Sequence, residues 1–175
     1  MYSIKKDLGQ LALLAMLTAM AVVLRIAHII PVPNVQPVTD MLMIVTLVIG
    51  FFFGFAMAIL VMVISNIFLG FGIWTIPQIL SYAICILTVF LLAKILPVKK
   101  HFLLQLIIAG LLGFEYGFFV SIGMAIFGGI PGFIAYWTSG LLFDAYHAVG
   151  NLIFYPILYK PMQLGIKYYE RRISK

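Results

Sequence analysis

The residues best suited to chemistry in this chain are concentrated in one polar stretch between apolar sequences. Residues 24–40 supply two charged side chains, an imidazole, two amides and a hydroxyl: Arg25, His28, Asn34, Gln36, Thr39 and Asp40. Prolines at positions 31, 33 and 37 remove backbone donors and fix φ, so no helix runs through the stretch. We expect a loop at one membrane face that closes over a cavity, with Arg25 and Asp40 paired; a plain extracellular connector is the alternative.

A second group combines amides with aromatic side chains and comprises Asn66, Trp74, Gln78, Tyr82, Tyr136 and Trp137. Trp and Tyr commonly line the membrane interface, and this accounts for Trp74 and Trp137 without any ligand. It does not account for the amides and Tyr82, which we expect one or two turns deeper. Apolar walls with a few convergent polar groups suit a small-molecule pocket. Because both groups are expected at the same face, we predict a substrate-binding site open to the outside.

Three further ionisable residues, Glu115, Asp144 and His147, fall within apolar sequence. Such groups cost roughly 2.5–3.5 kcal/mol each at the centre of a membrane helix, so each requires a structural or functional reason. We predict an internal polar brace between two helices, with a polar floor beneath the cavity as the functional alternative. A proton relay through the same residues would make the chain a proton-coupled carrier that works alone.

These residues must be positioned by helices in a membrane. The chain has 175 residues, of which 65% are hydrophobic and 9% are charged, too apolar for a soluble domain of this size. A crossing needs roughly 20 apolar residues. We therefore expect an all-α integral membrane protein, with residues 1–175 as a single six-helix domain. The expected helices cover about 8–27, 38–50, 54–69, 75–95, 102–125 and 133–155, after which Pro156 and Pro161 should deflect a basic tail.

The basic residues are distributed asymmetrically between the two expected faces. With the N-terminus in the cytoplasm, ten of the eleven Lys and Arg residues fall on the cytoplasmic side: Lys5, Lys6, Lys94, Lys99, Lys100, Lys160, Lys167, Arg171, Arg172 and Lys175. Only Arg25 falls outside. This pattern predicts cytoplasmic N- and C-termini and an even number of crossings. The net charge of +6 is thus explained by topology and lipid contact, and nucleic acid is not expected as a partner.

Motifs for catalysis are absent from the sequence. It contains no glycine-rich loop ending in Lys-Ser or Lys-Thr, no His-Glu-x-x-His and no Gly-x-Ser-x-Gly. The single cysteine, Cys85, excludes an internal disulfide. We expect no enzyme activity, no catalytic residue, no metal and no cofactor, and an intramembrane enzyme or purely structural subunit has the least support. Energy for any transport would come from a partner or an ion gradient.

Small residues repeat along one face of the first expected helix at Ala12, Ala15 and Ala19. Small side chains let helix backbones approach closely in lipid. The face would either pack inside the chain or dock a second membrane protein. Gly113 and Gly117 have a similar spacing, and we assign them to internal packing.

The chain resembles the substrate-binding (S) components of energy-coupling factor (ECF) vitamin transporters over its whole length. The resemblance lies in size and topology, the AMLTA segment at Ala15–Ala19, and the PNVQPVT loop at Pro33–Thr39. It extends to the SNIFLG segment at Ser65–Gly70 and to WTIPQ at Trp74–Gln78.

The resemblance implies a multi-pass protein of the bacterial plasma membrane that captures a vitamin and delivers it inward. It implies a transmembrane coupling protein that docks on Ala15 and Ala19 and is itself bound to two ATPase subunits. It also implies that the loop from Asn34 to Thr39 closes over the ligand. The loop is most similar to cobalamin-type members, which makes cobalamin the expected substrate. The outer face is expected to carry few cationic side chains, namely Arg25 and His28, and this agrees with a nearly neutral ligand.

Overall fold

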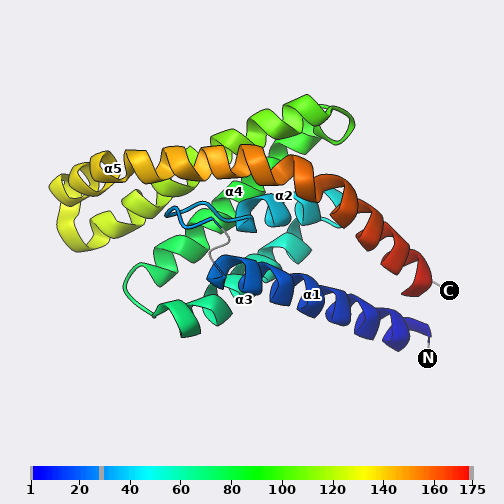
Figure 1. Ribbon diagram of the computed structural model, residues 1–175. Helices are drawn as coiled ribbons and strands as arrows, with labels where there is room; N and C mark the ends of the chain where they lie inside the picture. Colours follow the sequence, from blue (N-terminus) through cyan, green and yellow to red (C-terminus); the bar gives the residue numbers. More distant parts are fainter. Residues whose placement is uncertain (1, 28–29, 174–175) are drawn as a thin grey trace.

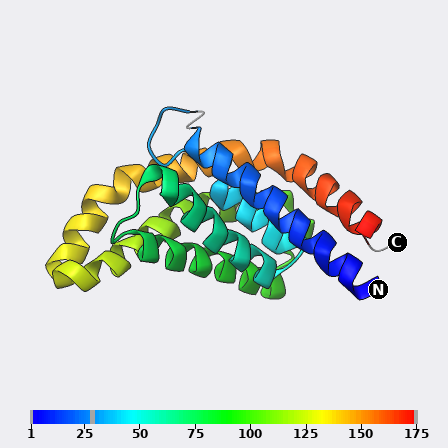
Figure 2. The same cartoon turned by 90° about the horizontal axis from the view of Figure 1, so that it is seen from below.

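The helices of this chain pack around one short central helix. The computed structural model describes residues 2–27 and 30–173, with side chains described from Asp7 onward. Five α-helices are found within this part of the chain: α1 Tyr2–Ile26, α2 Val38–Val48, α3 Phe51–Leu69, α4 Thr75–Ile95 and α5 Phe102–Ile173. A 3-10 turn, η1, covers Val98–Lys100. The two chain ends lie at the same end of the molecule (Figures 1 and 2).

The long helix α5 is divided by one residue. Gly129 has φ 61° and ψ −159°, values outside the helical region that glycine adopts without a Cβ penalty. The first arm (102–128) and the second arm (130–173) fold back on each other as a hairpin at the end away from the termini (Figure 1). Pro131 lies in the first turn of the second arm, where a missing N–H costs no helical hydrogen bond.

The predicted end of the last helix near Tyr155 is wrong. The second arm continues through Pro156 and Pro161 to Ile173. Met162 and Ile166, beyond both prolines, are buried in the hydrophobic core, so tertiary packing holds this part of the helix in place. Neighbouring helices commonly compensate for proline in membrane helices, and the arm curves instead of ending (Figure 1).

Within the described residues, four helices are long and apolar enough to cross a membrane: α1, α3, α4 and α5. Counted in this way α5 is one helix, so the expected six crossings remain a prediction, as does the side on which the termini lie. The high content of apolar helix agrees with a membrane protein.

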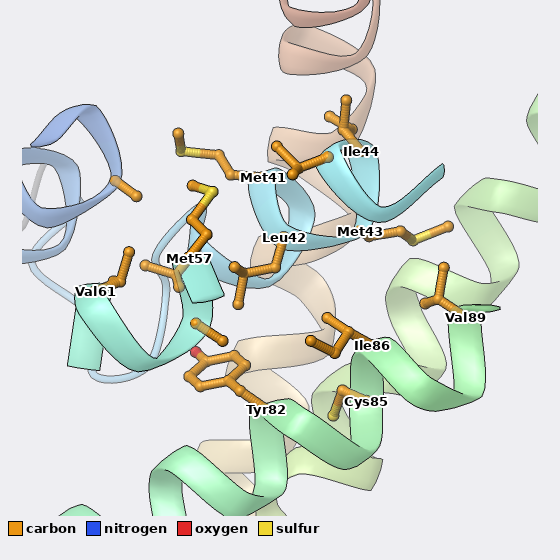
Figure 3. Packing of buried hydrophobic residues seen from close by; sticks show 14 of the residues in the cluster. Met41, Leu42, Met43, Ile44, Met57, Val61, Tyr82, Cys85, Ile86 and Val89 are labelled. Atoms are coloured by element: carbon orange, nitrogen blue, oxygen red, sulfur yellow. The ribbon is translucent and has the colours of Figure 1, made fainter. Parts of the chain in front are cut away.

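The core is built around α2. All residues from Val38 to Leu47 are buried, and a helix that is buried on every face lies in the centre of a bundle. Figure 3 shows Met41 and Leu42 of α2 packed against Met57 of α3 and Ile86 of α4. With 11 residues, α2 is about 16 Å long at 1.5 Å per residue, well short of the roughly 30 Å hydrocarbon core. It therefore ends within the bundle.

Candidate substrate-binding site

A cavity of about 450 Å³ lies between the loop before α2, the start of α4 and both arms of α5. It is lined by Pro33, Asn34, Gln78, Tyr116, Gly117, Val120, Ser121, Tyr136, Ser139, Gly140, Phe143 and Asp144. The hairpin of α5, which supplies most of this wall, lies at the end opposite the termini (Figures 1 and 2). Asn34, Gln78 and Tyr136 were predicted as substrate-binding residues, and the structure brings all three to one cavity.

A buried hydrogen-bond network holds Gln78 in place. The Arg25 guanidinium, 7% exposed at the end of α1, donates to the Ser65 hydroxyl and, at 2.8 Å, to Oδ1 of Asn66. Nδ2 of Asn66 donates to Oγ1 of Thr75 at 3.1 Å and to Oε1 of Gln78 at 3.2 Å. Arg25 and Asn66 therefore lie behind the cavity wall, where they join the ends of α1, α3 and α4 and orient the amide that reaches the cavity.

The predicted pair between Arg25 and Asp40 is wrong. Arg25 is directed to Ser65 and Asn66 in α3, and both carboxylate oxygens of Asp40 are buried without a hydrogen-bond partner among the described residues. The sequence places the two residues on either side of one loop, but α3 packs against the end of α1 and offers nearer acceptors. Asp40 is fully buried in the first turn of α2 and does not line the cavity.

Tyr82 and Thr39 form a second layer beneath Tyr116. The rings of Tyr82 and Tyr116 lie 4.4 Å apart between centroids, and Tyr116 meets the imidazole of His147 edge to face at 5.1 Å. Nε2 of His147 is 2.7 Å from Oγ1 of Thr39. Tyr82, Thr39 and His147 are all buried, so they support the wall of the cavity and only Tyr116 reaches it.

The three residues predicted as one polar brace lie in three different settings. Glu115 accepts a hydrogen bond of 2.6 Å from Thr88 of α4, His147 contacts α2, and Asp144 lines the cavity opposite Gly117. Within the described part of the chain, no hydrogen bond joins these three side chains to one another. Two other hydrogen bonds link the two arms of α5: the Asn151 amide donates to the carbonyl of Ala109 at 2.8 Å, and the Tyr155 hydroxyl donates to Oε1 of Gln105 at 2.8 Å.

The two arms approach closely at Gly113 and Gly117, as the spacing predicted. A Cβ at Gly113 would collide with the backbone of Ala148, and one at Gly117 would collide with the Asp144 carboxylate. The absence of side chains at these positions lets the carboxylate sit between the arms at the cavity wall.

The remaining predicted site residues lie elsewhere. Trp137 stacks on Phe133 at 5.7 Å and meets Phe118 at 5.4 Å, forming an aromatic cluster in the hairpin beside the cavity. Trp74 is 43% exposed and packs over Gly72. Gln36 is half-buried in the loop and does not line the cavity. His28 lies outside the described residues.

The sequence interpretation missed several lining residues, chiefly Tyr116, Ser121 and Ser139. Ser121 continues the four-residue spacing of Gly113 and Gly117, and this signal could have placed one face of the first arm at the cavity. Tyr116 falls in a run of aromatic residues that has no pattern of its own.

The chemistry of the cavity is that of non-covalent binding. Its polar groups are two amides, two phenols, two hydroxyls and one carboxylate, that of Asp144. No group of three His, Cys, Asp or Glu side chains suited to a metal ion is found among the residues that the structure describes. The volume falls within the roughly 300–1,000 Å³ usual for small-molecule sites. The arrangement therefore suits a polar organic molecule with donors to offer and little negative charge.

The predicted docking face on α1 is free of internal contacts that would bury it. Ala12, Ala15 and Ala19 are all exposed. The larger side chains beside them are exposed too, Leu8 at 61% and Met16 at 51%. In a protein embedded in lipid this face meets either lipid or another membrane protein.

Comparison with known proteins assigns the family. A family model described as "ECF transporter, substrate-specific component" matches residues 9–159, which include the cavity, its supporting network and the alanine face. Neither the comparison with curated proteins nor that with solved structures gave a match. The chain therefore belongs to the family of ECF transporter substrate-specific components.

Proposed function

We propose that the chain captures a vitamin from outside the cell in the cavity between the 30–37 loop, α4 and α5, and delivers it inward with an ATP-driven ECF module. The observation that carries this proposal is the cavity of about 450 Å³, lined by amides, phenols and hydroxyls. It lies at the end of the molecule away from both termini. The end of α4, the turn η1 and the C-terminal end of α5, all of which carry basic residues, lie toward the opposite end (Figure 1), which the positive-inside rule assigns to the cytoplasm.

The charge of the cavity favours a ligand that is not an anion. Among the described residues, Asp144 supplies the one carboxylate of the cavity and no Lys or Arg side chain lines it, since Arg25 is engaged behind the wall. An anionic vitamin such as folate or pantothenate would meet repulsion from Asp144 with no cation to offset it. Cobalamin remains our first candidate because of the loop resemblance. Its bulk would require the loop that carries Pro33 and Asn34 to move aside, whereas a small vitamin such as pyridoxine fits within the observed volume.

A binding series tests the substrate. Purified protein is titrated with cobalamin, pyridoxine, folate and pantothenate, and thermal stabilisation is measured. We expect stabilisation by cobalamin, and stabilisation by another vitamin alone would reject that choice. Asn34→Gly should weaken binding, because it removes a lining amide while glycine accepts the left-handed φ of 62° found there. Gln36→Ala, a loop amide that does not line the cavity, is the matched control.

The coupling proposal is tested in vesicles. We expect uptake only with the ECF coupling protein, both ATPases and ATP present. Uptake driven by a pH step with the chain alone would instead establish the proton-coupled carrier. Ala15→Trp or Ala19→Trp should abolish uptake and leave ligand binding intact, because a bulky ring on the exposed α1 face blocks close approach. Leu103→Trp, at a 68% exposed position of α5, serves as the control.

A further inference from the structure

A second cavity lies at the end of the molecule that carries the basic residues. It has a volume of about 250 Å³ and is lined by Ile44, Leu47, Val48, Lys99, Gln105, Tyr159, Gln163 and Lys167. Its origin is the shortness of α2, which ends at Val48 while η1 and the second arm of α5 continue past it. We call this space the basal cavity.

The wall that carries Lys99 is fixed by hydrogen bonds to buried groups. Nε2 of Gln105, 1% exposed, donates to the carbonyl of Val98 at 2.7 Å. The hydroxyl of Tyr155 donates to Oε1 of the same glutamine at 2.8 Å. Val98 itself is fully buried, so the first residue of the 3-10 turn is anchored to α5 by packing and by the hydrogen bond from Gln105. Lys99 is thereby presented from a rigid turn, and Lys167 faces the same space from the second arm.

The basal cavity is electrostatically one-sided. Among the described residues, two ammonium groups line it and no carboxylate does. The Gln163 amide and the Tyr159 hydroxyl, 3.4 Å apart, add neutral polar groups beside the lysines. The opposite wall, from Ile44, Leu47 and Val48, is wholly aliphatic. A ligand that satisfies both walls carries a negative charge at one end and apolar surface at the other.

We propose that the basal cavity binds the phosphate of an anionic phospholipid, with the phosphate against Lys99 and Lys167 and the glycerol and upper acyl chain against α2. Its position at the basic end of the molecule corresponds to headgroup depth at the cytoplasmic leaflet, where anionic lipids attract Lys and Arg. Inorganic phosphate shares the anionic chemistry, but it has no apolar part to place against Val48, the one residue of the aliphatic wall that is only half-buried. The bound lipid ties η1 to the second arm of α5.

Lipid selectivity of the purified full-length chain provides the test. Bound lipids are counted by native mass spectrometry after exchange into phosphatidylcholine micelles with increasing phosphatidylglycerol. Inorganic phosphate is titrated separately as a competitor. Lys99→Gln with Lys167→Gln removes both charges and keeps similar length. Lys94→Gln with Lys160→Gln removes two basic residues that do not line the basal cavity. Vitamin binding at the opposite end checks that each variant is folded.

We expect one phosphatidylglycerol to be retained by the wild-type chain and by the control variant. Each cavity lysine should contribute about 5-fold in affinity, so the Lys99/Lys167 variant should bind roughly 25-fold more weakly. Competition by inorganic phosphate at millimolar concentration would identify free phosphate as the ligand and overturn the assignment to a phospholipid. Equal losses in both variants, or no preference for phosphatidylglycerol over phosphatidylcholine, would overturn the proposal.

Discussion

Replacement of Asn66 tests the network that positions the cavity wall. Asn66 is 1% exposed and joins Arg25, Thr75 and Gln78 through three hydrogen bonds. Asn66→Leu keeps a similar volume and removes all three. The two neutral bonds contribute about 0.6 kcal/mol each inside a membrane bundle. The charge-assisted bond from Arg25 contributes about 1.5–3 kcal/mol, which brings the expected loss of unfolding free energy to about 3–4 kcal/mol.

The assay is reversible unfolding in mixed micelles by titration with SDS, combined with ligand binding. Binding should weaken about 5-fold, because the Gln78 side chain must then be ordered by the ligand at a cost of about 1 kcal/mol. Gln163→Leu, which removes an amide with one long bond of 3.4 Å, is the control and should cost less than about 0.5 kcal/mol.

A double-mutant cycle isolates the charged contact. Arg25→Met removes the guanidinium. The Arg25→Met/Asn66→Leu double variant should lose less unfolding free energy than the two single variants lose together, and the difference should be about 1.5–3 kcal/mol. The reasoning would be refuted by a single loss below about 1 kcal/mol for Asn66→Leu, or by strict additivity. Either result would mean that Arg25 finds equivalent partners without Asn66.

Three further substitutions test separate parts of the site. Asp40→Asn should leave thermal stability unchanged or raised, because both carboxylate oxygens are buried without a hydrogen-bond partner among the described residues. A clear drop in melting temperature would reveal a favourable contact of the charge. Gly117→Val should abolish ligand binding, because the valine side chain would displace the Asp144 carboxylate. Gly140→Ala, where a Cβ meets open space in the same cavity, should bind ligand normally. Equal binding by both variants would contradict the close approach of the arms. Thr39→Val should cost about 1 kcal/mol in SDS unfolding through loss of the 2.7 Å bond to His147, and no measurable loss would argue against this contact.

The amino-acid composition determined the helical, membrane-embedded character of this protein, and the positions of proline and glycine determined most helix ends. The predicted bounds for the second, third and fourth helices agree with α2, α3 and α4 to within a few residues. Pro37, Gly70 and the Gly128–Gly129 pair mark chain breaks through local sterics, which act in the same way whatever the tertiary structure. The amides and tyrosines that contribute to the cavity were also recognisable from the sequence, because a polar side chain within apolar sequence costs free energy in a membrane and requires a structural or functional reason.

Tertiary structure alone decided which groups meet. Arg25 was expected to pair with Asp40, but α3 places Ser65 and Asn66 nearer, and no sequence spacing encodes that neighbour. Pro156 should have ended a helix by its local geometry, yet buried contacts beyond it keep α5 continuous. Tyr116 reaches the cavity because the arms of α5 close on Gly113 and Gly117. Sequence fixes the local conformations available to a segment, whereas these outcomes depend on free energies of packing between segments that lie far apart in the chain.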